Sequence, residues 1–249
     1  SGVSLSVRSS LSVTNGSTTG ITTTTAENGT YILSSMSAGG YTIESSKSGY
    51  ITGYFNVNVC GNLTNQNNNI SESLNSESMR IVVHWAADSV AVILDSHLTG
   101  PDNNTGRFHI YWNTSTAVTG NYRHPDNFYY HTNAYQCNSC TTAQASDNVS
   151  LDRDDMDGAP GTETITITKV RSGTYRYSVH DYTNRNNSSS TKLAESGTTV
   201  NVFYNNTQTT YNVPNSAGNL WEVFTFDGST GVLAASDNMT SHSNYDTIQ

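Results

Sequence analysis

Acidic side chains gather in one short stretch of the sequence, at a spacing that suits a metal ion. Asp152, Asp154 and Glu163 match the first, third and twelfth positions of an EF-hand loop. Met156 and Asp157 do not suit the fifth and sixth positions, so the stretch is not an EF-hand, but it still predicts a structural Ca²⁺ site. A solvated acidic turn, in which aspartates cap backbone amides, is the alternative. The candidate ligands are Asp95, Asp152, Asp154, Asp155, Asp157 and Glu163.

The three cysteines divide into a close pair and a single residue. Cys137 and Cys140 form a CxxC motif in a loop rich in Tyr and Asn. No helical pattern follows the motif, as a redox site would need, and a zinc site would need a second cysteine pair. We therefore expect a disulfide between Cys137 and Cys140, formed in an oxidising compartment. Cys60 remains, either as a buried thiol or as a disulfide to another chain.

Histidines and aromatic residues gather in the long polar stretch 113–148. His124 and His131 lie there among tyrosines, either as a metal pair or, more simply, as part of a packed aromatic loop. His97 follows Asp95 by two residues, and we expect a structural hydrogen bond between them. Tyr and Trp rings also stack on sugars, although packing within the loop or at a subunit contact is the alternative. The candidates for glycan stacking are Trp112, Tyr129 and Tyr130.

Asn-x-Ser/Thr motifs, the acceptors of N-linked glycans, recur along the chain. A sequence so rich in Asn, Ser and Thr produces many of them by chance, so the argument rests on their placement in predicted turns. We expect several of them to carry glycans. The acceptor residues are Asn15, Asn28, Asn62, Asn69, Asn103, Asn113, Asn148, Asn186, Asn187, Asn205 and Asn238.

The composition excludes some classes of partner. Lys and Arg together number 11 and the net charge is −9, so we expect no basic patch and no nucleic-acid binding. The sequence contains no run of 18 apolar residues, so we expect no insertion into a membrane. The chain begins with Ser1, and we expect a mature or trimmed product of an extracellular or cell-surface protein.

Residues 1–72 show the period-two alternation of β-strands. The tight-turn pairs Asn28-Gly29 and Gly39-Gly40 separate the alternating segments. Strands spaced by about ten residues predict a small β-sandwich domain. The expected strands are 3–7, 31–33, 41–43 and 55–59.

Residues 79–249 predict a second β-sandwich, which a patternless linker at 71–78 separates from the first. The stretch at about 113–148 interrupts this domain and is typical of an insertion. The fold class expected for the whole chain is therefore all-β, with two tandem sandwiches and no helix. The expected strands are 80–85, 90–94, 108–112, 163–170, 175–180, 199–204 and 221–226.

The first domain resembles the carboxypeptidase regulatory-like, or transthyretin-like, family. The resemblance rests on Thr25 to Tyr31, on Ala38 to Ile43 and on Gly49-Tyr50. It implies a small immunoglobulin-like sandwich. That family begins with a further strand before the segment that matches Gly2 to Leu5, and this strand is missing here. Either the chain is trimmed, or another subunit supplies the strand.

The second domain resembles the YfaP-like family of secreted β-sandwich domains, which implies a jelly-roll-like fold. The match covers Leu94 to Leu98 with Gly100-Pro101, the acidic run Leu151 to Gly158, and Gly173 to Tyr175. The insertion at about 113–148 and the order Pro160 to Glu163 depart from the family pattern. The resemblance implies fold and location, and it implies no catalytic residue.

No motif for nucleophilic, metalloprotease or phosphate chemistry occurs, so we expect no enzyme. We expect a structural subunit of an extracellular, glycosylated filament or surface appendage that assembles into a homopolymer. A sheet edge without its neighbour tends to bind another strand, and residues 241–249 are a candidate donor. The alternative is a carbohydrate- or surface-binding accessory module of a larger secreted protein.

Overall fold

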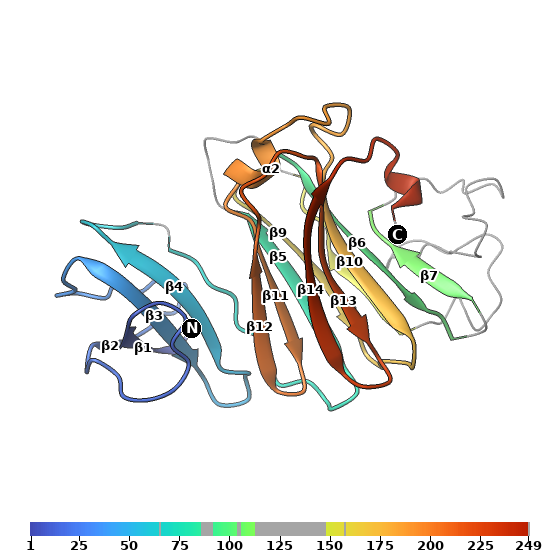
Figure 1. The fold of residues 1–249 in the computed structure, drawn as a ribbon. Coiled ribbons are helices and arrows are strands. Elements are labelled where there is room, and N and C mark those ends of the chain that lie inside the picture. Colours follow the sequence, from blue (N-terminus) through green and yellow to red (C-terminus); the bar gives the residue numbers. More distant parts are fainter. Residues whose placement is uncertain (65, 86–91, 104–105, 113–147, 157, 249) are drawn as a thin grey trace. The chain divides into compact units, whose positions relative to one another are not determined.

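The computed structural model describes residues 1–64, 66–85, 92–103, 106–112, 148–156 and 158–248 (Figure 1). The chain forms two compact units. Unit 1 contains Ser1–Ser76 with Phe203–Gln208, and unit 2 contains Glu77–Val202 and Thr209–Gln249. The division between residues 76 and 77 falls inside the segment expected to be a linker.

Unit 1 contains one four-stranded antiparallel sheet with the order β2-β1-β3-β4. Val7 lies opposite Ile43, and Ile43 lies opposite Phe55, so apolar side chains from three strands share one face. Leu5, Val7, Ile43 and Val57 are buried there and form the core of the unit. The strands are β1 (Ser4–Ser9), β2 (Thr22–Thr24), β3 (Gly39–Ser46) and β4 (Gly53–Val59).

The strand expected at residues 31–33 is not formed. These residues alternate between half-buried and exposed, as in a strand, but they have no ladder partner in the described part of the chain. Alternation depends on the local sequence, whereas a strand also needs a neighbour that supplies its hydrogen bonds. In the part of unit 1 that the structure describes, irregular segments rather than a second sheet therefore cover the apolar face of the sheet.

Unit 2 is built on two five-stranded sheets, with the orders β14-β13-β10-β6-β7 and β12-β11-β5-β9-β8. The tip of the hairpin between β11 and β12, Phe203–Gln208, is the part of these sheets that belongs to unit 1. The two sheets pack face to face: the ring centroids of Tyr211 on β12 and Phe224 on β13 lie 5.4 Å apart. The strands are β5 (Met79–Trp85), β6 (Leu94–Pro101), β7 (Arg107–Ile110), β8 (Val149–Arg153), β9 (Gly161–Ile167), β10 (Thr174–Asp181), β11 (Thr199–Tyr204), β12 (Thr207–Asn212), β13 (Leu220–Asp227) and β14 (Val232–Thr240).

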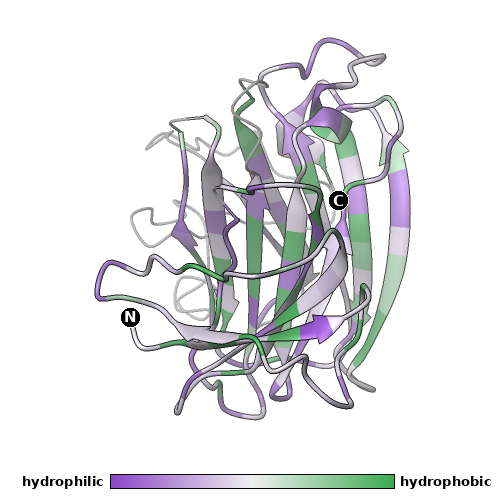
Figure 2. Cartoon of the chain, turned by 90° about the vertical axis from the view of Figure 1, so that its left-hand side faces the viewer, coloured by the Kyte–Doolittle hydropathy of each residue, from purple (hydrophilic) through white to green (hydrophobic). Residues whose placement is uncertain are grey.

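The expectation of an all-β, sandwich-type fold is confirmed. Apolar residues recur along the strands of the sheets (Figure 2), and both Trp85 and Trp221 are fully buried. Among the described residues, two short helical turns, α2 (Lys192–Glu195) and η1 (Tyr245–Thr247), are exceptions to the expectation of no helix. No helix in the described part of the chain is long and apolar enough to cross a membrane.

Candidate functional site

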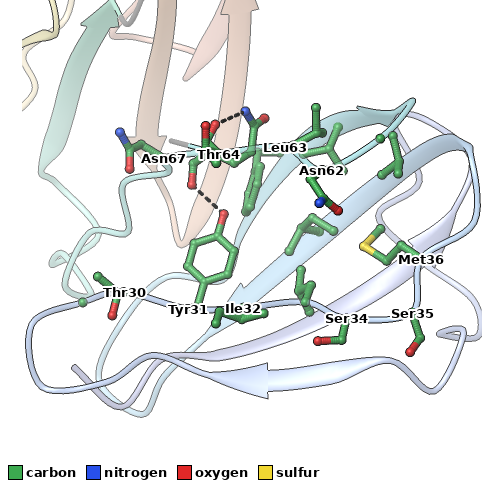
Figure 3. A pocket seen from close by; sticks show the side chains of 18 of the residues that line it. Thr30, Tyr31, Ile32, Ser34, Ser35, Met36, Asn62, Leu63, Thr64 and Asn67 are labelled. Carbon is green, nitrogen blue, oxygen red and sulfur yellow. Dashed lines mark hydrogen bonds between the residues drawn. The ribbon is translucent and has the colours of Figure 1, made fainter.

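Unit 1 has a cavity of about 840 Å³ over the apolar face of its sheet. We call it the unit 1 cavity. One wall is the segment 28–36, the floor comes from β3 and β4, and the other wall comes from residues 61–64, 66 and 67 (Figure 3). The apolar side chains that line it are Tyr31, Ile32, Leu33, Met36, Ile43, Phe55, Val57, Val59 and Leu63.

A tight turn places the first wall of the cavity. Gly29 adopts a φ of 82°, which glycine tolerates better than other residues, and its N–H donates to the carbonyl of Ala26 at 3.0 Å. Asn28 Oδ1 accepts the backbone N–H of Thr30 at 3.1 Å. From this turn, the Tyr31 hydroxyl donates across the cavity to the carbonyl of Gln66 at 2.6 Å (Figure 3). The two walls are therefore tied together at one end.

The backbone of Tyr31–Met36 has no hydrogen-bond partner among the residues that the structure describes. Leu33 and Met36 are half-buried against the cavity, whereas 78% of the surface of Ile32 is exposed. The segment thus has the side-chain pattern of a strand without the pairing of one. Unpaired N–H and C=O groups of this kind are a template for strand addition.

Unit 2 contains a buried cluster of carboxyl and imidazole groups. Asp95 and His97 alternate on β6 and therefore point to one face of the sheet, and His180 on β10 lies directly opposite Asp95. One potential ligand atom from each of these three residues lies within 4.8 Å of the others. All three are buried, with at most 2% of their surface exposed.

Asp95 also belongs to a second group, with Asp154 and Glu163, whose potential ligand atoms lie within 4.8 Å of one another. Glu163 is on β9 of the facing sheet, and its Oε2 accepts the backbone N–H of Ser96 at 2.6 Å. Burial raises the pKa of Asp95 and of Glu163 well above the ordinary values; the Asp95 carboxylate raises the pKa of Glu163 further, and the Asp154 carboxylate raises the pKa of Asp95. The Trp112 indole N–H lies near the Asp95 carboxyl and lowers its pKa. The two groups do not, however, meet the geometry of an ordinary hydrogen bond.

The imidazoles of the cluster are held in the neutral form. Burial lowers the pKa of His97 well below its ordinary value, and His109 lowers it further. Burial also lowers the pKa of His180, to about 4. At neutral pH both rings therefore carry a lone pair on one nitrogen, which is the form that binds a metal ion.

The candidate Ca²⁺ ligands separate in the structure. Asp95, Asp154 and Glu163 meet, as described above. Asp152 instead accepts the Thr166 hydroxyl at 2.5 Å, and Asp155 pairs with the Arg153 guanidinium at 2.9 Å. Asp157 lies outside the described residues.

The hydrogen bond expected between Asp95 and His97 is absent from the bonds that the described residues make. His97 Nδ1 lies 2.9 Å from His109 Nε2 instead, because the register of β6 with β7 brings His109 to the same side of the sheet. The sequence did not single out His109 or His180 as members of a site. The only local signal was the Asp-x-His spacing on a strand, and the partner strands had to be known to complete it.

The remaining candidate residues have different surroundings. Cys60 is exposed and its thiol is free. Trp112 is half-buried and packs on Tyr182 and Tyr245, with ring centroids 5.3 and 5.8 Å away. Outside the described residues lie Asn113, His124, Tyr129, Tyr130, His131, Cys137 and Cys140.

Most of the asparagines in the glycosylation motifs are accessible. The exposed ones are Asn15, Asn28, Asn62, Asn186, Asn187, Asn205 and Asn238, and the half-buried ones are Asn69, Asn103 and Asn148. Asn28 and Asn62 also line the unit 1 cavity. A glycan on either residue would therefore stand at the mouth of that cavity.

No protein-family model matches the chain, and no curated protein and no solved structure matches it either. The resemblances to the carboxypeptidase regulatory-like and YfaP-like families therefore stay predictions from the sequence.

Proposed function

We propose that the protein is a structural subunit of an extracellular, glycosylated assembly, and that copies join when an extended segment of one copy enters the unit 1 cavity of the next. The unpaired backbone of Tyr31–Met36, beside an apolar cavity, carries this proposal. An added strand would hydrogen-bond to this segment and bury the apolar side chains that line the cavity.

The chemistry of the cavity favours a second copy of this chain as the occupant. Its described lining contains apolar, hydroxyl and amide side chains and no Asp, Glu, Lys or Arg. An occupant must therefore be uncharged, because an unpaired charge buried there would cost several kcal/mol, of the order given for isolated buried ions. Charged residues make up only 12% of this chain, so its own segments meet that requirement.

Two further features support an assembly outside the cell. Cys60 is exposed and directly precedes Gly61, which lines the cavity, so a disulfide between copies would form beside the docked strand. The exposed asparagines of the glycosylation motifs suit the secretory pathway of the producing cell. The carbohydrate-binding alternative has weaker support, because Tyr182 and Tyr245 pack against the ring of Trp112.

The proposal is tested by sedimentation velocity of the intact chain across a range of concentrations. Leu33→Glu places a charge in the cavity and is expected to abolish assembly. Leu11→Glu, at a residue of unit 1 that is 44% exposed and does not line the cavity, is the matched control and is expected to assemble like the unmodified chain. Circular dichroism confirms that each variant is folded.

Sedimentation of the unmodified chain is measured first, because a variant can remove assembly only where assembly occurs. Assembly that Leu33→Glu removes and Leu11→Glu retains would support the proposal. A chain that stays monomeric at every concentration, or one whose assembly survives Leu33→Glu, would overturn it.

A further inference from the structure

Four buried polar atoms at the carboxyl–imidazole cluster of unit 2 lack hydrogen-bond partners among the described residues. They are Asp95 Oδ2, His97 Nε2, Glu163 Oε1 and His180 Nδ1. A buried polar group without a partner costs about 1–3 kcal/mol, and such groups are uncommon in native proteins. Several of them around one point indicate a missing ligand rather than a packing defect.

The other side of each imidazole is already engaged, and this orients the free nitrogen. His180 Nε2 lies 2.9 Å from the carbonyl oxygen of His242, which can only accept, so Nε2 carries the proton and Nδ1 has the lone pair. His97 Nδ1 lies 2.9 Å from His109 Nε2, and Nε2 of His97 remains free. Metal-binding histidines commonly donate from their second nitrogen in this way, which fixes the tautomer and the direction of the ring.

We propose that unit 2 binds one divalent transition-metal ion, best represented by Zn²⁺, through Asp95, His97 and His180. Tetrahedral Zn²⁺ with ligands at about 2.0 Å places its ligand atoms about 3.3 Å apart. The ligand atoms of these three residues lie within 4.8 Å of one another, so small side-chain rotations close the site. Glu163 belongs to the second group that contains Asp95, and it is a described candidate for the fourth ligand.

The charge of the cluster also favours a bound cation. Asp95, Asp154 and Glu163 lie together, and Asp95 and Glu163 are buried away from water. Carboxylates crowded in this way repel one another when they are all ionised. A doubly charged ion removes that repulsion and satisfies the free oxygens at the same time.

The types of ligand atom at the site indicate which metal ion it suits. Ca²⁺ takes six to eight oxygen ligands, whereas two of the three ligands here are imidazole nitrogens. Imidazole with carboxylate suits Zn²⁺ and its first-row neighbours. The site therefore differs from the Ca²⁺ site expected from the sequence: it keeps Asp95 and replaces the acidic turn by two histidines.

Because the site is buried, the test loads the metal during folding. The intact chain, without a histidine tag, is unfolded in denaturant with EDTA and refolded with ZnCl₂, with CaCl₂ or with EDTA alone. We expect one Zn²⁺ per chain by elemental analysis. With Zn²⁺ at about 100 times its Kd, the Tm should rise by roughly 5–10 °C over the EDTA sample.

Two variants locate the ion. His180→Gln should lose both the bound Zn²⁺ and the rise in Tm. His84→Gln is the matched control, because His84 on β5 is half-buried and hydrogen-bonds to Gly161 and Thr162 rather than to the cluster. Co²⁺ provides a second measurement that does not depend on stability: its visible absorption should show nitrogen ligands in His84→Gln and lose them in His180→Gln.

Three outcomes would overturn the proposal. One is the absence of stoichiometric Zn²⁺ in the refolded chain. Another is Zn²⁺ that His180→Gln retains in full. The third is a rise in Tm with Ca²⁺ but not with Zn²⁺, which would assign the ion to the carboxylates alone.

Discussion

The imidazole Nε2 of His180 lies 2.9 Å from the carbonyl oxygen of His242, and this hydrogen bond ties β10 to the C-terminal segment. The backbone N–H of His242 in turn donates to Asn219 Oδ1 at 2.7 Å. Ile248 is also buried, with 2% of its surface exposed. His242 and Ile248 therefore hold the C-terminal segment against unit 2, which argues against its role as a donor strand.

Removing the buried side chain at the end of this segment should destabilise unit 2. We expect Ile248→Ala to lower the free energy of unfolding by about 2–5 kcal/mol, through lost burial and the cavity left behind. Val232→Ala is the control: Val232 is 57% exposed, and its change should stay within about 0.5 kcal/mol. Urea unfolding followed by tryptophan fluorescence measures both. Equal effects would mean that the C-terminal segment is not docked.

Gly161 lies against the ring of the fully buried Trp85. A Cβ atom at Gly161 would lie 2.0 Å from Trp85 Cζ2, so the ring has to move to accept it. Gly161→Ala should therefore destabilise unit 2 by about 1–3 kcal/mol, as overpacked core variants do. Thr164→Ala, at a half-buried position of the same strand, is the comparison and should have the smaller effect in urea unfolding. A Gly161→Ala variant with the same free energy of unfolding as the unmodified chain would contradict the close contact.

The occupancy of the glycosylation motifs should follow the proposed interface. In material isolated in its assembled form, we expect glycans at exposed residues away from the cavity, such as Asn15, Asn205 and Asn238. Asn28 and Asn62 line the cavity and should be unmodified, because a glycan there would block an incoming strand. Glycopeptide mass spectrometry reads each position separately. Full occupancy of Asn28 or Asn62 in assembled material would exclude docking at the cavity.

Cys60 should take part in the assembly that forms under oxidising conditions. Because its thiol is exposed and adjoins the cavity wall, we expect a disulfide-linked dimer on non-reducing electrophoresis of the assembled chain. Cys60→Ser should remove the linked dimer and leave sedimentation of the assembly unchanged, since strand addition rather than the disulfide holds the copies together. A thiol that stays reduced in assembled material would contradict this arrangement.

Local pattern was enough to predict the all-β fold, but not every pairing. The alternation at Tyr31 and Leu33 correctly indicated which side chains turn inward. It could not show that no strand of the described chain lies beside them, because the partner of a strand is set by distant sequence. The same limit applies to the tight turn at Asn28-Gly29, which forms as expected but leads into an unpaired segment.

The candidate metal site was only partly predictable for the same reason. Asp95 and Glu163 are far apart in sequence and meet because β6 and β9 face each other from two sheets. His180 joins them through the register of β10 with β6. Asp152 was an equally good candidate by spacing, but the Thr166 hydroxyl satisfies its carboxylate locally.

Hydrogen exchange of the amides in Tyr31–Met36 tests directly whether a strand from another copy pairs with this segment. Peptides that cover this segment are compared by mass spectrometry between the dilute chain and the assembled material. We expect rapid exchange in the dilute chain, where these amides have no partner among the described residues, and protection in the assembly, where a neighbouring copy supplies the partner strand. Assembled material in which the segment exchanges as fast as in the dilute chain would contradict this pairing.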